Sequence, residues 1–261
     1  MTSILSMIAI LTAAPVLCQN DEEWRFDVRG RGWYAQTGGS IQADGATPGS
    51  RLNLRSTLEL DDRELSPDVE FVAHSPGFGS FIGEWWRFAS SADETLTTDI
   101  TFRGRTFVTG APLHSSIRVD VGAATYELPI AHLSLGGAGR LELAVQGGAR
   151  AFWAEGALRS PGEDATARGF AITPVLGGHV AWLVRPWLRV DADASGMKLS
   201  LSSDRFSYLE TKGEVTARPF KWLSAGIGYK YVLLDAHITR SVTTTYDLDL
   251  AGPYLTVGIE F

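Results

Sequence analysis

The sequence contains few of the features that define soluble redox proteins, helical membrane proteins or nucleic-acid-binding proteins. It has one cysteine and three methionines among 261 residues, and no run of basic residues. One cysteine cannot form a disulfide framework within the chain. Mean hydropathy is close to zero, which argues against a bundle of apolar membrane helices. The formal net charge is −7, so we expect no nucleic-acid partner.

The one long apolar run is at the start of the chain, from Ile4 to Leu17. It is too short to cross a bilayer comfortably as a mature helix. The run ends in small and short residues, and Cys18 and then an acidic stretch follow it. This pattern predicts a cleavable signal peptide in residues 1–18 and a mature domain in residues 19–261. No Lys or Arg precedes the run, which departs from the usual export signal, and a lipoprotein anchored at Cys18 is the alternative.

After this segment the hydrophobic pattern changes to a period of two. Trp24–Arg29 alternates apolar with charged residues, and Leu188–Asp193 does the same. No stretch keeps a helical period over three turns. A strand with one apolar and one charged face needs two different environments. In a soluble sandwich the apolar face would be the core, whereas in a membrane barrel it contacts lipid and the charged face lines the interior.

Strand length and loop length favour the membrane barrel. Segments such as Ser115–Leu128 exceed the five or six residues usual in soluble sheets and are long enough to cross the hydrocarbon at a tilt. Some connections are tight, such as Arg185-Pro186, whereas Thr37–Ser66 and Thr95–Pro112 are long and polar. Such asymmetry is typical of outer-membrane barrels. Aromatic residues that predict an interfacial girdle gather at the tight turns: Trp182, Trp187, Phe220 and Trp222.

The last residues alternate apolar with other residues and end in an aromatic residue. With the signal-like start, the long strands and the glycine-led segment Gly49–Leu54, this end resembles a largely uncharacterised family of bacterial outer-membrane, porin-like β-barrel proteins. The resemblance implies export to the outer membrane, contact with outer-membrane lipid, and recognition of the last strand by the barrel-assembly machinery. It implies no cofactor and no catalytic residues. The assembly signal would comprise Leu255, Val257, Ile259 and Phe261.

We therefore expect an all-β, transmembrane, antiparallel up-and-down barrel of about ten strands. Eight or twelve strands are the alternatives, because both termini of such barrels lie on one side and the number is even. Twelve would require Arg51–Leu60 and Ile100–Val108 to pair, and we place the first of these in the first outer loop. The ten predicted strands are Trp24–Tyr34, Val69–His74, Phe81–Phe88, Ser115–Leu128, Leu141–Ala154, Phe170–Leu183, Trp187–Met197, Phe206–Ala217, Leu223–His237 and Tyr246–Phe261.

If apolar residues contact lipid, charges of both signs enter the interior. A barrel of about eight strands is only wide enough for side chains, and open channels need about sixteen. We therefore expect these charges to pair across an occluded interior, and a selective path for small solutes is the alternative. The predicted interior charges are Arg25, Asp27, Arg29, Arg31, Arg118, Asp120, Glu142, Arg150, Arg189, Asp191, Asp193, Glu210, Lys212, Glu214, Lys230 and Glu260.

No catalytic or metal-binding motif is evident in the sequence. The five histidines are far apart and lack the spacing of metal ligands. Asp235 and His237 share one strand face near an outer rim, where they are the only candidates for an outer-membrane enzyme. Asp61, Asp62 and Glu64 could bind calcium, although a solvated acidic loop explains them as well.

The sequence thus predicts a non-enzymatic integral outer-membrane barrel with a structural or surface-interaction role. A narrow porin-like channel and an outer-membrane enzyme are the alternatives. Any extracellular partner is left open by the sequence.

Overall fold

The computed structural model describes residues 23–60, 63–201, 204–239 and 243–261, which are almost entirely β-strand. Its only described helical element is the 3₁₀ turn Gly136–Ala138. None of the helical structure in these residues is long and apolar enough to cross a membrane. The predicted signal peptide and Cys18 lie outside the described residues.

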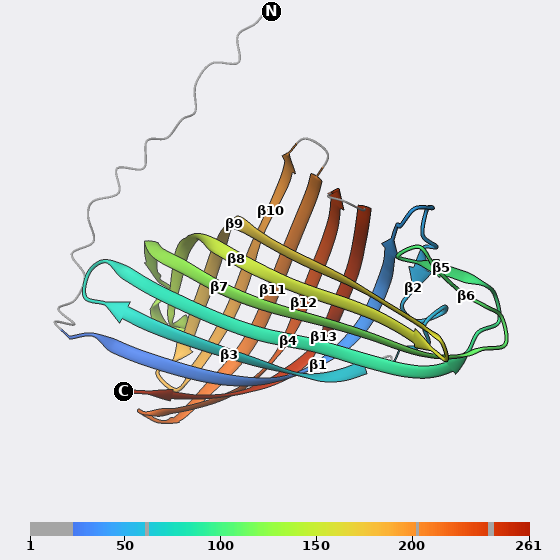
Figure 1. The fold of residues 1–261 in the computed structure, drawn as a ribbon. Coiled ribbons are helices and arrows are strands. Elements are labelled where there is room, and N and C mark those ends of the chain that lie inside the picture. Colours follow the sequence, from blue (N-terminus) through green and yellow to red (C-terminus); the bar gives the residue numbers. More distant parts are fainter. Residues whose placement is uncertain (1–22, 61–62, 202–203, 240–242) are drawn as a thin grey trace, which may run out of the picture.

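Ten long antiparallel strands pair in sequence order and close into a ring, because β13 pairs with β1 (Figure 1). This confirms the predicted all-β barrel and its ten strands. The ring contains β1 (Arg25–Ala43), β3 (Arg63–Ser75), β4 (Gly79–Thr95), β7 (Pro112–Ser134), β8 (Arg140–Ser160), β9 (Glu163–Arg185), β10 (Leu188–Leu201), β11 (Asp204–Phe220), β12 (Leu223–Thr239) and β13 (Thr243–Glu260).

Three short strands lie outside the ring. β2 (Leu52–Asn53) pairs only with the end of β1, and β5 (Ile100–Phe102) pairs only with β6 (Arg105–Phe107). The two segments that could have raised the strand number to twelve are therefore parts of loops. The placement of residues 51–60 in the first outer loop is confirmed.

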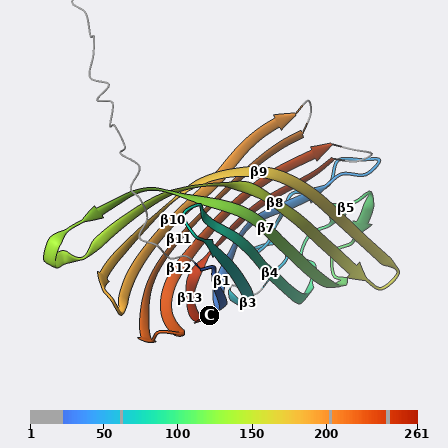
Figure 2. The ribbon, with the colours of Figure 1, turned by 90° about the vertical axis from the view of Figure 1, so that its left-hand side faces the viewer.

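The paired residues show how strongly the strands are staggered around the ring. Stepping across each ladder from Arg25 passes through His74, Ser80, Glu127, Gln146, Gly177, Ser195, Glu210, Val232 and Leu250, and returns to β1 at Thr37. This shift of twelve residues in a ring of ten strands requires the strands to tilt by roughly 40° from the barrel axis. Figure 2 shows this slant clearly.

The two ends of the barrel differ. The start of β1 and the end of β13 lie together at one end, which we call the terminal end, where the backbone N–H of Phe26 donates to the carbonyl of Phe261 over 2.8 Å. Tight turns at Ser75–Gly79, 185–188 and 220–223 belong to this end, whereas the long connections 44–62 and 96–111 belong to the other, the loop end. The turn asymmetry expected from the sequence is present.

The outer surface carries an apolar band bordered by aromatic residues. Along β1, exposed side chains from Trp24 to Tyr34 cover eleven residues, a length suited to crossing the hydrocarbon of a bilayer at a tilt. The predicted aromatic residues at the tight turns are all exposed: Trp182, Trp187, Phe220 and Trp222. A second group borders the band toward the loop end: Tyr34, Trp85, Trp153, Phe170 and Tyr229.

The polarity of the strand faces reverses between the two ends. Near the terminal end of β1, Arg31 is buried and Val28 is exposed. Near the loop end of β7, Val119 is fully buried in the apolar core, and Asp120 faces outward, where its carboxylate accepts a hydrogen bond from Nε of Arg87 at 2.6 Å. The terminal half thus has the pattern of a membrane barrel, and the loop half has that of a water-soluble one.

Candidate functional site

The charged interior of the terminal half is the main cluster of functional side chains. It forms because strands of period two place every second side chain inside. On β11, Glu210, Lys212 and Glu214 point inward, while Leu209 and Val215, which flank this segment, are exposed on the outer face. Neighbouring strands contribute charges of the opposite sign at the same level of the ring.

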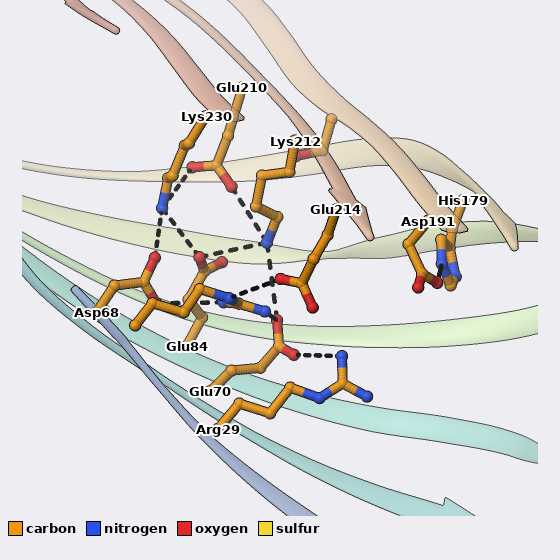
Figure 3. A network of polar contacts seen from close by, with 12 residues as sticks. Arg29, Asp68, Glu70, Glu84, His179, Asp191, Glu210, Lys212, Glu214 and Lys230 are labelled. Atoms are coloured by element: carbon orange, nitrogen blue, oxygen red, sulfur yellow. Dashed lines mark hydrogen bonds and ion pairs between the residues drawn. The ribbon is translucent and has the colours of Figure 1, made fainter. Parts of the chain in front are cut away.

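Eleven of these residues form one connected set, which we call the central ion-pair network. Figure 3 shows its part around Lys230, Lys212 and Glu210. Five cations and six carboxylates are joined by ion pairs of 4.0 Å or less. They are Arg29, Arg31, Arg150, Lys212 and Lys230 with Asp27, Asp68, Glu70, Glu84, Glu210 and Glu214.

Lys230 of β12 lies at the centre of the network and has no exposed surface. Its Nζ donates to Asp68 at 2.9 Å and to Glu84 at 3.1 Å, and lies 3.6 Å from a carboxylate oxygen of Glu210. The same ammonium lies 5.2 Å from the ring centre of Trp33 and 5.0 Å from that of Trp86. Three carboxylates and two aromatic faces therefore compensate for its lost hydration.

Arg150 of β8 anchors the opposite wall. Its Nη1 donates to Glu210 at 2.7 Å and to the Tyr208 hydroxyl at 2.6 Å, and its Nη2 donates to Ser195 at 3.2 Å. Tyr208 also donates a short hydrogen bond to Glu210. A buried charge is stable only when it is paired and hydrogen-bonded, and this guanidinium meets both conditions.

A second cluster lies nearer the terminal end, around His179 of β9. Nδ1 is 2.8 Å from Glu127 and Nε2 is 2.9 Å from Asp191. Arg189 donates to Asp191, and Gln146 donates to Glu127. Ionised carboxylates only accept hydrogen bonds, so both ring nitrogens must donate and the side chain is an imidazolium. This cluster joins β7, β8, β9 and β10 across the interior.

The two clusters border a small cavity of about 100 Å³. It extends from His74 and Arg218 near the terminal end to Arg150 in the central network. Its volume accommodates several water molecules and no large solute. Toward the loop end Trp33 and Trp86 are buried at 0% and 1% exposure and pack edge to face. The cavity therefore ends below this aromatic pair.

An apolar core fills the interior beyond the aromatic pair. It combines inward side chains of the ring with residues of the long loops, so that the loops fold into the mouth of the barrel. The ring supplies side chains such as Phe88, Val119, Phe152 and Leu248, and the loops supply Leu52, Leu54, Leu58, Leu60, Leu96, Ile100, Phe102 and Phe107. The barrel is thus closed at two successive levels.

The structure places fourteen of the sixteen predicted interior charges on the inner face of the ring or at its terminal end. Arg25 pairs there with Glu260 at 3.8 Å, and Glu142 pairs with Arg140. The prediction is wrong for Arg118 and Asp120. Both lie on the outer face, because the inner face of β7 is apolar at this height. Those on the inner face or at the terminal end are Arg25, Asp27, Arg29, Arg31, Glu142, Arg150, Arg189, Asp191, Asp193, Glu210, Lys212, Glu214, Lys230 and Glu260.

Sequence reasoning missed several members of the two clusters. Glu70 lies between the exposed residues Val69 and Phe71, and Glu84 precedes the exposed Trp85, each inside a predicted strand, so alternation could have found them. Asp68 lies one residue before a predicted strand. His179 is far from the other histidines in the sequence, and nothing near it indicates its partners. Pairing between distant strands was needed to recognise these four as part of the site.

The other candidates are not assembled into a site. Asp235 is exposed on the outer face of β12, and His237 instead bonds Thr245 at 3.0 Å. Asp61 and Asp62 lie outside the described residues, and Glu64 belongs to β3. No group of three potential metal ligands was found in the described part of the chain.

The outer rim carries its own polar contacts. His114 Nδ1 lies 2.8 Å from Asp93, beside an open pocket of about 570 Å³. In the second long loop, the Thr109 hydroxyl and backbone N–H both donate to Asp99, which lowers the pKa of that carboxyl below its ordinary value. These contacts tie the loop end together.

A closed ring of ten tilted strands with an apolar outer band and a charged interior is the fold of outer-membrane β-barrel proteins. The chain is similar to the outer membrane protease OmpT from Escherichia coli, with a TM-score of 0.51 and 7% identity over 95% of this chain and 99% of that one. At such low identity the likeness shows the fold alone.

Two further solved structures align over most of their length at lower TM-scores. The translocator domain of the autotransporter NalP from Neisseria meningitidis has a TM-score of 0.40 and 11% identity, covering 94% of this chain and 91% of that one. The attachment invasion locus protein Ail of Yersinia pestis has a TM-score of 0.34 and 10% identity, covering 92% of this chain and 99% of that one. No protein-family profile and no curated protein matches the sequence.

Proposed function

We propose that the chain is a non-enzymatic integral barrel of the bacterial outer membrane, whose interior is occluded and whose loop end serves a structural or surface-interaction role. One observation carries the proposal: the interior is filled at two levels, by the central ion-pair network and by the apolar core. Such an interior fixes the barrel shape and leaves the loop end as the surface available to partners.

The exported location is supported by the fold, by the apolar band and by the alternating last strand. The outer face of β13 exposes Leu255, Val257 and Ile259, and Phe261 is exposed just after the strand ends. An assembly factor that binds this strand before the barrel closes would contact these side chains. Their role as an assembly signal is part of this proposal. So are export through residues 1–18 and contact of the band with outer-membrane lipid.

Conductance of the purified protein in planar bilayers tests the occluded interior. We expect no reproducible current steps, because the cavity ends at Trp33 and Trp86. A matched variant, Trp33→Ala with Trp86→Ala, removes the aromatic pair and leaves the apolar core in place, and it too should not conduct. Regular current steps from the unaltered protein would support the narrow-channel alternative. The observation that favours this alternative is the cavity between the two clusters, which has room for several water molecules.

The enzyme alternative has weaker support, because His237 bonds Thr245 rather than Asp235, and neither residue lines the cavity between the two clusters. If a hydrolytic activity is found at the loop end, the double variant Asp235→Asn with His237→Gln should leave it unchanged. Loss of that activity with retained folding would revive this pair as catalytic residues.

A further inference from the structure

The contact between Lys230 of β12 and Asp68 of β3 differs from the other pairs of the central ion-pair network. Nζ and Oδ2 lie 2.9 Å apart, and neither side chain has any exposed surface. An ε-amine is a nucleophile once it loses a proton, whereas a guanidinium keeps its protons. The other lysine of the network, Lys212, lies 3.3 Å or more from its carboxylates, and its side chain is 12% exposed. Within the network, Lys230 and Asp68 are therefore the pair held closest to reaction.

A general base lies beside this amine. Oε1 of Glu84, on β4, accepts a hydrogen bond from Nζ of Lys230 at 3.1 Å. A carboxylate in contact with a nucleophile is placed to take its proton. Transfer of a proton from the ammonium to Glu84 removes one buried charge of each sign, and burial favours such neutralisation. Figure 3 shows Lys230 between the carboxylates of Asp68 and Glu84.

The carboxyl group of Asp68 has a different partner on each oxygen. Nη1 of Arg31 donates to Oδ1 at 3.3 Å, whereas Lys230 donates to Oδ2. A cationic donor on Oδ1 stabilises the negative charge that develops there when a nucleophile adds to Cγ. Oδ2, which lies against the proton source, is thus the oxygen placed to leave.

Water is kept away from the two reacting groups. Trp33 and Trp86 are buried, and their ring centres lie 5.2 and 5.0 Å from Nζ of Lys230. Glu84 lines the cavity between the two clusters, whereas Lys230 and Asp68 do not. A dry site favours loss of water from an amine and a carboxyl group and protects the resulting amide from hydrolysis. The released water has the cavity beside Glu84 to enter.

We propose that Lys230 and Asp68 condense to an amide, an isopeptide bond that joins β12 to β3, with Glu84 as the catalytic residue. Nζ attacks Cγ of Asp68, the bond from Cγ to Oδ2 breaks, and the amide bond forms. Two of the three ammonium protons pass by way of Glu84 to Oδ2 and leave with it as water. The third proton stays on the amide nitrogen, and no oxidant or other co-reactant is needed.

The ion-paired arrangement of Figure 3 is the state before this reaction. The bond would join two residues that are 162 positions apart in the chain. A cross-link over so long a loop restricts the unfolded chain and thereby stabilises the folded one. The reaction occurs once, within the chain, and is compatible with a protein that turns over no substrate.

Mass spectrometry of the full barrel tests the proposal. Four forms are compared: the unaltered protein, Glu84→Gln, Lys230→Arg and the control Glu214→Gln. Glu214 belongs to the same network, but its ion pair is with Arg31. Masses are taken as differences from the unaltered protein, so that any processing of the first residues cancels. A heat-dependent gel shift establishes that each variant is folded, and a tryptic digest of each form locates the bond.

We expect the unaltered protein and the Glu214 control to lack the mass of one water molecule, and the other two variants to retain it. In the digest of the unaltered protein, fragment 64–87 should be joined to fragment 222–240, because acylated Lys230 is no longer a cleavage site. Cleavage after Lys230, with the two fragments separate, would overturn the proposal whether or not the variants fold. Complete loss of water in folded Glu84→Gln would overturn the catalytic role of Glu84.

Discussion

At the scale of single residues, the protein places charges of both signs inside the half of the barrel whose outer surface is the apolar band. Buried ion pairs lose hydration, and their attraction compensates only when the geometry is good and further hydrogen bonds are made. Lys230 and Arg150 satisfy this condition with several partners each. The network therefore stabilises one arrangement of strands more than it adds overall stability, since a wrong register would separate these charges.

Lys230→Met should lower the free energy of unfolding by about 3–5 kcal/mol, because it removes the cation that Asp68, Glu84 and Glu210 share and leaves one buried negative charge of the network uncompensated. Urea titration of the folded barrel in lipid vesicles measures this change. The matched control is Arg159→Met, whose exposed ion pair with Asp164 at 3.7 Å should contribute less than about 1 kcal/mol. Equal losses in the two variants would contradict the central role of Lys230.

At the scale of the strands, the main feature is the reversal of polarity along one element. β12 carries exposed Ile227 in the apolar band and exposed Asp235 beyond it. Its inward side chains change from Lys230 to Val232 and Leu234. A strand that leaves the bilayer exchanges the environments of its two faces, so both faces change composition at nearly the same height.

Arginine substitutions on β12 test where this change lies. Ile227→Arg should cost about 2–4 kcal/mol of folding free energy in vesicles, because it places a charge at the depth of the hydrocarbon. Asp235→Arg lies on the same face of the same strand, beyond the band, and should change stability by less than about 0.5 kcal/mol. Similar costs at both positions would show that the band is misplaced.

The first long loop is predicted to be an anchored element. Leu54 is fully buried in the apolar core, whereas Ser56 is exposed. Leu54→Asp should release the loop and raise its cleavage rate by added protease at least about tenfold, because each 1.4 kcal/mol lost from anchoring raises the open population tenfold. Ser56→Asp should leave the rate unchanged. If neither variant is cleaved faster, the loop is not held by this side chain.

Alternation along the chain predicted the ten strands, the apolar band and most of the interior charges. A period of two identifies two faces and does not say which is inside, so Arg118 and Asp120 were assigned to the wrong face. Pairs such as Lys230 with Asp68, which are 162 residues apart, depend on the stagger of twelve residues around the ring. Burial of the loops in the barrel mouth depends on tertiary packing. Nothing in the sequence around Leu52 and Leu54 indicates that these side chains are buried there.

At the scale of the whole molecule, the protein is a closed barrel with three zones. A charged terminal half lies within the apolar band, an aromatic pair separates the halves, and an apolar core fills the loop half. This arrangement explains how a chain with a mean hydropathy near zero can be a membrane protein. In the proposed membrane location, lipid contacts the outer face of the terminal half, and water contacts the outer face of the loop half.

The central claim is that this chain folds as a closed barrel in the outer membrane. Its most direct test is to express the full chain with its first residues, isolate outer membranes, and compare the protein's gel mobility in detergent before and after heating. We predict that the protein is in the outer-membrane fraction and that its mobility changes on heating, because a closed barrel resists detergent until it is heated. A soluble periplasmic protein with the same mobility in both samples would contradict the account.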